Sequence, residues 1–222
     1  MEIAPPHLLF LGDAADQLAA KTAEGLARWR LGDCAGQLRL PGCAADCGLP
    51  DLTLEAGREA GARSLVVGVA NRGGTLAESW LPTLLRALEL GYDIAAGLHD
   101  RLSDRPELAE AARRHGRRLI DIRHADRRFP VASGRPRPGR RLLTVGTDCS
   151  VGKMVTALAL TAALKDRGAR ATFRATGQTG ILIAGGGVPV DALPGDFIAG
   201  AAEWLTPAND PDHWDIVEGQ GS

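Results

Sequence analysis

The amino-acid sequence predicts an α/β protein with two doubly wound, parallel-sheet domains, and three observations favour this class. Short apolar runs alternate with segments of helical periodicity along most of the chain, as in parallel sheets with crossover helices. A stretch rich in proline and glycine at 125–140 interrupts this alternation. A glycine-rich, phosphate-binding motif at 146–153 then opens a new strand–helix unit.

The first half of the chain contains four predicted strands with helices between them. Continuous apolar runs indicate strands buried on both faces, and apolar residues three and four apart indicate amphipathic helices. The predicted strands are 7–11, 64–70, 93–96 and 118–122. The predicted helices are 15–29, 52–59, 78–89 and 106–115. These elements predict a first domain over residues 1–124.

Residues 125–140 form a predicted interdomain linker, because three prolines and two glycines fall within sixteen residues. The second domain is predicted over residues 141–222, where a new strand–helix alternation begins. Its predicted strands are 141–145, 170–174 and 213–217, and its predicted helices are 152–166 and 196–205.

Composition argues against several classes of function. The chain of 222 residues is 45% apolar and has a formal net charge of −1, so it has a packed core and no global field for nucleic acid. Residues 101–141 contain 13 arginines and five acids, but their only aromatic side chain is Phe129, whereas nucleic-acid sites interleave aromatics for stacking. We therefore predict a solvated helix face and linker there, and no nucleic-acid partner.

Targeting and metal signals are also absent from the sequence. No apolar run has the roughly 18–20 residues of a membrane span, and the N-terminus lacks a signal peptide, which predicts a cytoplasmic protein with reduced thiols and no membrane partner. Cys34, Cys43 and Cys47 lack the paired spacing of a zinc site, and no histidine lies nearby in sequence. We predict no metal site. The sequence leaves open whether the protein forms a homo-oligomer.

The glycine-rich motif fits the pattern GxxxxGK of a P-loop. Its glycines let successive backbone N–H groups point at phosphate oxygens, while the helix N-terminus and Lys153 add positive charge. The preceding apolar run and the following helix supply the context that this mechanism needs. The predicted cofactor-binding residues of the loop are Gly146, Thr147, Asp148, Cys149, Ser150, Val151, Gly152, Lys153 and Met154.

The residue after the P-loop lysine departs from the usual pattern. An NTPase places Ser or Thr there to hold Mg²⁺, whereas this chain has Met154, and the first hydroxyl along the helix belongs to Thr156. On a helix Thr156 does not take the usual direction toward the metal. The phosphate cradle is therefore kept while a metal ligand is lost. The pyrophosphate of coenzyme A, held without obligatory Mg²⁺, fits such a loop better than Mg·ATP.

Two further glycine-containing segments follow predicted strands of the second domain, RATGQTG at 174–180 and EGQG at 218–221. Ligands of parallel sheets bind beyond the carboxyl ends of the strands, and glycine lets a ligand approach the backbone closely. We therefore expect both segments to join the P-loop in one site. The site residues that they add are Arg174, Gly177, Gln178, Thr179, Glu218 and Gly219.

Together the segments GTDCSVGKM, RATGQTGILIAGGGVP and DHWDIVEGQGS resemble the DgcN-like family, long known only as a domain of unknown function. In the first half GDAADQLAAKTAEGLARWR, GVANRGGTLAESW and GLHDRL are similar to the N-terminal domain of that family. The resemblance covers essentially the whole chain. It implies a Rossmann-like N-terminal domain and a C-terminal domain like that of P-loop NTPases.

The resemblance also implies an activity, the N-acetylation of D-glutamate with acetyl-CoA, ahead of conversion to L-glutamate by a partner enzyme. The P-loop would hold the pyrophosphate of CoA. Met154 is usual in the family, whereas Val155 replaces a threonine that family members tend to have. Family members continue well beyond Ser222, so we expect an incomplete C-terminal domain.

Two other functions stay open. A more distant likeness, carried by GTD, GK and EGQG, is to dethiobiotin synthetase and related ATP- and Mg²⁺-dependent ligases or kinases. In that class Glu218 would lie near Mg²⁺ and Asp148 near the phosphates. A regulator that binds a nucleotide without catalysis is the second alternative.

The hypothesis for acetyl transfer gives each residue a role. Glu218 is the general base or positions the amine, and Arg174 or Arg72 holds the substrate carboxylate by a bidentate contact. Asp148 is a further catalytic candidate, and Gly177 and Gly219 approach the substrate. A lowered pKa would let Cys149 act as a nucleophile, although a small residue that fills the loop is the simpler interpretation. The amino-acid substrate and its handedness are not decided by these residues.

Overall fold

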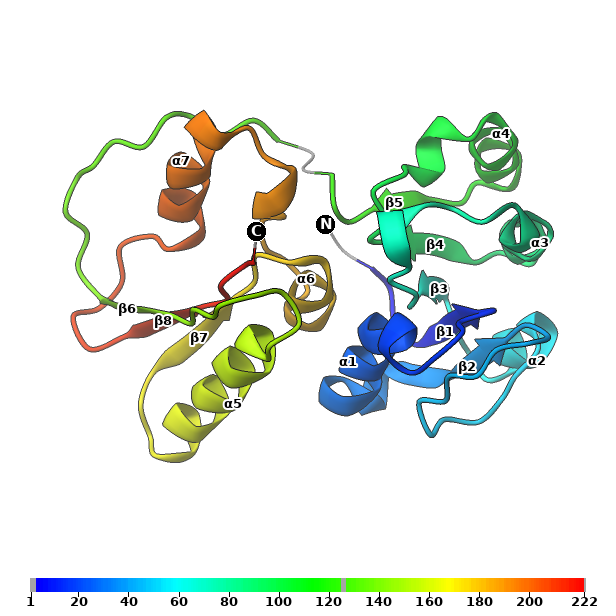
Figure 1. The fold of residues 1–222 in the computed structure, drawn as a ribbon, viewed down its shortest axis with the longest axis horizontal. Helices are drawn as coiled ribbons and strands as arrows, with labels where there is room; N and C mark the ends of the chain where they lie inside the picture. Colours follow the sequence, from blue (N-terminus) through cyan, green and yellow to red (C-terminus); the bar gives the residue numbers. More distant parts are fainter. Residues whose placement is uncertain (1–2, 125–126, 222) are drawn as a thin grey trace. The chain divides into compact units, whose positions relative to one another are not determined.

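The computed structural model describes residues 3–124 and 127–221, which divide into two compact units, Met1–Arg123 and His124–Ser222. Each unit has its own parallel sheet flanked by helices (Figure 1). The predicted α/β class with two parallel sheets is confirmed. Within the described residues, none of the helices combines the length and apolar character that crossing a bilayer needs.

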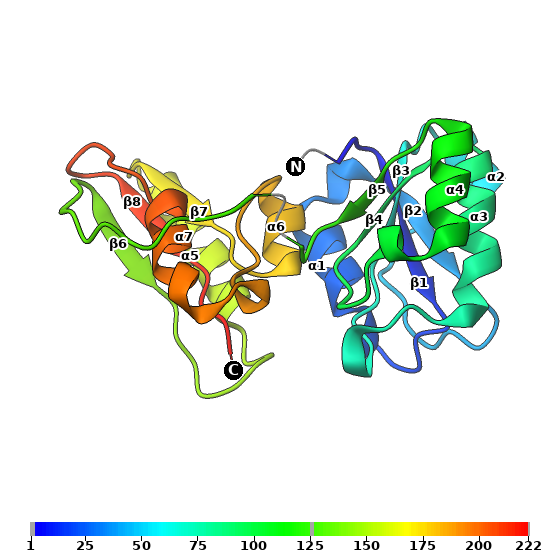
Figure 2. The same cartoon turned by 90° about the horizontal axis from the view of Figure 1, so that it is seen from above.

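The first unit contains a five-stranded sheet in the order β2-β1-β3-β4-β5, with every neighbouring pair parallel. Its strands are β1 His7–Gly12, β2 Cys34–Arg39, β3 Ser64–Val67, β4 Asp93–Ala96 and β5 Leu119–Asp121. Its α-helices are α1 Lys21–Trp29, α2 Leu54–Glu59, α3 Leu81–Glu89 and α4 Pro106–His115. Helix α1 covers one face of the sheet, and the other three helices cover the opposite face (Figure 2).

The core of the first unit lies between its sheet and helices α2 to α4. Strand β1 is buried along its whole length, as its apolar run predicts, because both faces of the sheet are covered. Phe10 on this strand packs edge-to-face against Trp80, with ring centroids 5.6 Å apart. Tyr92 is fully buried, and its hydroxyl donates to the carbonyl oxygen of Leu54 at 2.7 Å.

Strand β2 is the main difference from the predicted elements of this unit. Its sequence CAGQLR has no continuous apolar run, so hydrophobic pattern does not indicate a strand. Gln37 on this strand is nevertheless only 1% exposed. Its buried side-chain amide is satisfied because Nε2 donates to Asp46 and Asp51 at 2.9 and 3.0 Å. The backbone N–H of Cys47 donates to the side-chain oxygen Oε1 of Gln37 at 2.8 Å. One buried amide therefore holds the loop after β2 against the strand.

The second unit contains a three-stranded parallel sheet in the order β6-β8-β7. Its strands are β6 Arg140–Leu143, β7 Ala171–Arg174 and β8 Trp214–Val217. Its α-helices are α5 Lys153–Asp166, α6 Gln178–Ala184 and α7 Gly195–Leu205. Helices α5 and α7 lie on opposite sides of this sheet (Figure 1). Short 3-10 helices complete both units at Leu18–Ala20, Leu31–Asp33, Arg72–Gly74, Glu78–Trp80, Leu102–Asp104 and Val190–Ala192.

Helix α6 replaces part of the predicted glycine-rich loop after β7. Gly180 within it and the glycines that follow it obscure its helical pattern, since glycine is a poor helix former. The helix is ended by Gly185, whose φ of 73° is left-handed. Its residues Ile181, Leu182 and Ile183 are buried, and this burial, rather than local propensity, stabilises the helix.

The described part of the segment 125–140, residues 127–140, lies along α7 of the second unit. Phe129 is buried against Ala201 and Leu205, and it meets Trp204 edge-to-face at 5.6 Å. The carboxylate of Glu203 accepts the backbone N–H groups of residues 133 and 134, each at 2.8 Å. The single aromatic residue of the arginine-rich stretch is therefore a core residue. Our division into 1–124, 125–140 and 141–222 stays a proposal.

Candidate functional site

The P-loop runs from the end of β6 to the start of α5, where the sequence predicts it. Residues 145–151 are all exposed, so the loop lies at the surface of the second unit. Gly152 has φ of 96°, which only glycine adopts readily, and Ser150 takes a left-handed φ of 58° despite its side chain. This curl turns the chain directly into α5 at Lys153.

Two polar contacts within the loop occupy groups that a bound anion would use. The Nζ of Lys153, which is 8% exposed, donates to the backbone carbonyl oxygen of Asp148. The backbone N–H of Cys149 donates to Asp148 Oδ1 at 2.7 Å. Hydrogen bonds from the thiol and N–H of Cys149 lower the pKa of Asp148, and Lys153 lowers it further. Asp148 is therefore ionised at neutral pH.

The segment after β8 packs directly against the P-loop. Thr144 links the two, because its hydroxyl donates to the carbonyl oxygen of Lys153 at 3.1 Å and accepts the N–H of Gly219 at 3.2 Å. A Cβ at Gly219 would overlap the carbonyl group of Thr144, and a Cβ at Gly221 would lie 2.7 Å from the nitrogen of Cys149. Glycine is therefore required at both positions. Thr144 was not singled out from sequence, since a lone threonine at a strand end carries no signal.

Glu218 joins the ends of β7 and β8. Its carboxylate is 5% exposed, and Oε2 accepts the backbone N–H groups of Thr176 and Gly177 at 2.9 and 3.1 Å. Burial raises the pKa of Glu218, although these two amide hydrogen bonds oppose the shift. A Cβ at Gly180 would overlap this carboxylate. Helix α6 can therefore lie this close to Glu218 only with glycine at position 180.

Further hydrogen bonds connect the two segments that contain Glu218 and Thr176. The hydroxyl of Thr176 donates to the carbonyl oxygen of Glu218 at 2.6 Å, and Gln220 Nε2 donates to that hydroxyl at 2.9 Å. Gln178 and Thr179 begin α6 directly after this contact and are half-buried. The structure therefore brings together the P-loop, residues 176–179 and residues 218–221 at the carboxyl end of the sheet, as expected.

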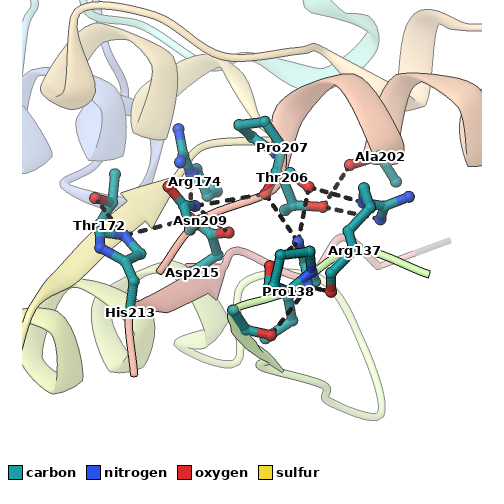
Figure 3. A network of polar contacts seen from close by, with 12 residues as sticks. Arg137, Pro138, Thr172, Arg174, Ala202, Thr206, Pro207, Asn209, His213 and Asp215 are labelled. Carbon is teal, nitrogen blue, oxygen red and sulfur yellow. Dashed lines mark hydrogen bonds and ion pairs between the residues drawn. The ribbon is translucent and has the colours of Figure 1, made fainter. Parts of the chain in front are cut away.

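Arg174 is held by a buried carboxylate that the sequence did not point to (Figure 3). Its Nε donates to Asp215 Oδ1 at 2.7 Å, and Asp215 is fully buried in the central strand β8. Asn209 Nδ2 donates to the other carboxylate oxygen at 3.1 Å. His213 Nε2 lies 3.7 Å from Asp215 Oδ1 and 3.1 Å from the hydroxyl of Thr172. The only sequence signal for this network is an acid in the middle of an otherwise apolar strand.

Arg72, the other candidate for a substrate carboxylate, belongs to the first unit. Its backbone lies in the 3-10 helix Arg72–Gly74, and its side chain lies outside the described residues. The roles assigned to Arg72 and Arg174 stay proposals.

The cysteines are all free thiols. Burial raises the pKa of Cys34 and Cys47 to about 11, so neither is a thiolate at neutral pH. Cys149 is exposed in the P-loop, with its Sγ 3.3 Å from Asp148 Oδ1. In the part of the chain that the structure describes, no three His, Cys, Asp or Glu side chains are grouped so that they could hold a metal ion.

Comparisons with known proteins agree with this architecture. A Rossmann-like domain of unknown function, DUF1611_N, matches residues 38–125, and the P-loop domain of unknown function DUF1611 matches residues 130–222. The crystal structure of a DUF1611 family protein from Anabaena variabilis is 33% identical, with a TM-score of 0.87 over 99% of this chain and 67% of that one. The chain belongs to the DUF1611 family. The resemblance noted from the motifs, and the Rossmann-like and P-loop domains that it implies, are confirmed.

Two further relatives extend the comparison. The chain is 57% identical over 220 residues to a D-glutamate N-acetyltransferase of Tritonibacter scottomollicae, covering 99% of this chain and 66% of the relative. It is 49% identical over 222 residues to a D-glutamate N-acetyltransferase of a Pseudoalteromonas species, covering 100% of this chain and 67% of the relative. The chain thus spans about two thirds of the length of these relatives.

Proposed function

We propose that this protein is an acetyl-CoA-dependent N-acetyltransferase of D-glutamate, with the P-loop holding the pyrophosphate of CoA. The observation that carries the proposal is the identity of 57% and 49% to two D-glutamate N-acetyltransferases across essentially all of this chain. The P-loop and its two partner segments, which are contiguous in space, supply a site of the required kind.

The residues of the loop fit a pyrophosphate. The loop residues 145–151 are exposed, Lys153 supplies a cation, and glycine at 219 and 221 keeps side chains out of the cradle. Met154 and Val155 offer no hydroxyl next to the lysine, which suits a pyrophosphate bound without a metal ion. When bound, acetyl-CoA would supply the activated acetyl group. The chain would supply binding, orientation and proton transfer.

Glu218 is the proposed general base. The amine of the substrate must lose a proton before or during acyl transfer, and a carboxylate with a raised pKa accepts a proton more readily near neutral pH. Amide donors hold Oε2 of Glu218 in place, which fixes the orientation of the whole carboxylate. Asp148 is the weaker base, since its pKa is lowered, and its charge suits the positioning of an ammonium group. Arg174, oriented by Asp215, is proposed to hold a substrate carboxylate.

Thermal unfolding with different ligands tests the cofactor assignment. We expect acetyl-CoA and CoA, but not Mg·ATP, to stabilise the protein by roughly 2.7 kcal/mol when present at about 100 times the Kd. Lys153→Ala should abolish most of this shift, because the loop loses its only full positive charge near the phosphates. Lys165→Ala, at an exposed position near the end of α5, is the matched control and should keep the shift.

The possible outcomes separate the candidate functions. A shift with Mg·ATP alone would favour an ATP-dependent ligase or kinase. A CoA affinity that Lys153→Ala leaves unchanged would reject the P-loop as the cofactor site. Binding of acetyl-CoA without acetylation of any amino acid, tested on a relative of full length, would favour a regulator.

A further inference from the structure

A chain of hydrogen bonds runs from the backbone of Glu218 to the side chain of Gln220. The hydroxyl of Thr176 donates to the backbone carbonyl oxygen of Glu218 at 2.6 Å. The side-chain Nε2 of Gln220 donates to the same hydroxyl at 2.9 Å. Thr176 and Glu218 are buried, whereas Gln220 is exposed. The chain of hydrogen bonds therefore begins among buried groups of the second unit and ends at a side chain that solvent reaches.

The direction of these hydrogen bonds is fixed at the buried end. A carbonyl oxygen can only accept, so the single proton of the Thr176 hydroxyl points at the backbone oxygen of Glu218. The hydroxyl oxygen then has only lone pairs to offer, and the end of the Gln220 amide that faces it has to be the N–H donor. A glutamine amide has one donor end and one acceptor end. Thr176 thus sets the orientation of this amide, and the acceptor Oε1 of Gln220 faces away from Thr176.

The same amide lies beside the carboxylate of Glu218. A Cβ at Gly177 would lie 3.1 Å from Glu218 Oε1, 2.7 Å from Gln220 Nε2 and 3.1 Å from Gln220 Oε1. Both side chains therefore converge on the point where any other residue at 177 would place its Cβ. The backbone N–H groups of Thr176 and Gly177 bind Oε2 of Glu218. Oε1 of Glu218 and Oε1 of Gln220 are thus two neighbouring oxygen acceptors, held from behind by the hydrogen bonds of Thr176 and Gly177.

Two neighbouring oxygen acceptors match a neutral primary amine. Of its two N–H groups, one loses its proton during acyl transfer, and the other stays in the amide product. Glu218, the proposed base, takes the first proton at Oε1 as the nitrogen bonds to the acyl carbon and CoA leaves as its thiolate. The amide oxygen of Gln220, which is not a base near neutral pH, suits the N–H that stays. A hydroxyl nucleophile has a single hydrogen, so it cannot use both acceptors.

We propose that Gln220 positions the substrate, with its Oε1 accepting the N–H that the amine of D-glutamate keeps, and that Thr176 acts through Gln220 by orienting its amide. The identities of the amine and of the base rest on the proposed function, whereas the orientation of the amide rests on the contacts of Thr176. All of these groups belong to the second unit. Gln220 thus makes the site selective for an amine over a hydroxyl group.

Calorimetric titration of the whole chain with D-glutamate and with D-2-hydroxyglutarate, in which a hydroxyl replaces the amine, tests the proposal. Gln220→Leu removes the acceptor and keeps the approximate size of an exposed side chain, so the fold is not at risk. We expect this variant to bind D-glutamate about tenfold more weakly and D-2-hydroxyglutarate within about twofold of the wild type. Gln17→Leu, at an exposed glutamine of the first unit, is the matched control and should change neither affinity.

Variants of Thr176 separate a positioning role from a merely structural one. Thr176→Val loses the hydroxyl that orients the amide of Gln220, whereas Thr176→Ser keeps it. We expect Thr176→Val to bind D-glutamate about threefold more weakly and Thr176→Ser to restore the affinity of the wild type. The double variant of Thr176→Val and Gln220→Leu should lose no more affinity than Gln220→Leu alone, because Thr176 acts through Gln220. Losses that add in the double variant would reject this role of Thr176.

Three results would overturn the role of Gln220. The first is a wild type that binds D-glutamate no more tightly than D-2-hydroxyglutarate, or binds neither. The second is an unchanged affinity of Gln220→Leu for D-glutamate. The third is an equal loss for both ligands in Gln220→Leu, because Gln220 would then only shape its segment.

Acetyl-CoA titration of the same proteins keeps this inference apart from the proposed function. Binding of acetyl-CoA without a preference for the amine would reject the role of Gln220 and leave the cofactor assignment standing. A preference for the amine that depends on Gln220, without binding of acetyl-CoA, would reject the proposed function and leave the contact of Gln220 standing.

Discussion

At the scale of single residues, the surroundings of a carboxyl group set its pKa and therefore how readily it accepts a proton. Glu218 and Asp148 are both carboxylates of the candidate site, but their surroundings shift their pKa values in opposite directions. Burial raises the pKa of Glu218, and hydrogen bonds from Cys149 lower that of Asp148. Pairs of carboxyl groups whose pKa values are pushed apart commonly divide the acid and base roles of an active site. Glu218 is the better proton acceptor of the two.

The raised pKa of Glu218 predicts a specific pH dependence of stability. The folded state disfavours the ionised carboxylate of Glu218. The contribution of Glu218 to the free energy of unfolding is therefore fully present below the pKa of the unfolded state, near 4.5, and is lost as pH rises through the raised pKa of the folded state. Glu218→Gln cannot ionise, and its carbonyl oxygen can still accept from Thr176 and Gly177. As pH rises from 4 to 7, the free energy of unfolding of the variant should therefore increase relative to that of the wild type.

Urea unfolding across that range measures the difference. Asp212→Asn, at an exposed carboxylate of the same unit, controls for general charge effects. Parallel stability curves for the wild type and Glu218→Gln would contradict the assignment of a raised pKa.

At the scale of elements, close packing of helix on strand depends on a few glycines. Gly68 follows β3 directly, and its carbonyl oxygen accepts the N–H of Ala23 in α1 at 3.1 Å. A Cβ at Gly68 would overlap the side chain of Ala23 and lie 3.1 Å from its Cα. Helix α1 can therefore lie this close to the sheet only when position 68 has no side chain.

Gly68→Ala should destabilise the first unit by about 1–3 kcal/mol, since α1 must move away from the sheet. Gly32→Ala is the matched control, because within the described part of the chain no atom beyond its chain neighbours lies within 4 Å of a Cβ there, and its φ is not left-handed. We expect the control to change the free energy of unfolding by less than about 1 kcal/mol, toward stability. Denaturant unfolding monitored by tryptophan fluorescence distinguishes these outcomes. Equal effects of the two substitutions would show that α1 adjusts at no cost.

The elements that were predicted and those that were missed differ in where their stability comes from. Strands β1, β3 and β4 each contain a run of three or more apolar residues, and α4 has helical periodicity with a glycine stop at Gly116, so local pattern suffices for them. Strand β2 depends on the side-chain contacts of Gln37, and α6 depends on burial of its apolar residues. Partners distant in sequence stabilise these two elements, so no window of sequence reveals them.

At the scale of the whole molecule, each unit has a sheet and a core of its own, and the smaller sheet carries a buried ionic network. Asp215 lies at the middle of the central strand and has Arg174, Asn209 and His213 around it. A buried carboxylate is stable only when it is paired and hydrogen-bonded. Removal of Asp215 would leave Arg174, whose side chain is 22% exposed, without its partner.

Asp215→Ala should therefore destabilise the second unit by about 3 kcal/mol, the lower end of the range for a broken buried pair, because Arg174 keeps some solvent. Asp212→Ala breaks an exposed pair with Arg170 and should cost less than about 1 kcal/mol. Native-state hydrogen exchange measures both effects, and protection of β1 and β3 in the first unit should stay unchanged. Loss of protection in both units would show that they unfold as one.

By itself the sequence determined the α/β class, the place and form of the P-loop and most of the strands around it, because these depend on periodicity and short-range spacing. Only the tertiary structure decided that Glu218 is buried against the amides of Thr176 and Gly177. The same holds for the pairing of Arg174 with Asp215. Desolvation and hydrogen bonding act between groups that lie close in space, and the fold places those groups together from distant positions of the chain.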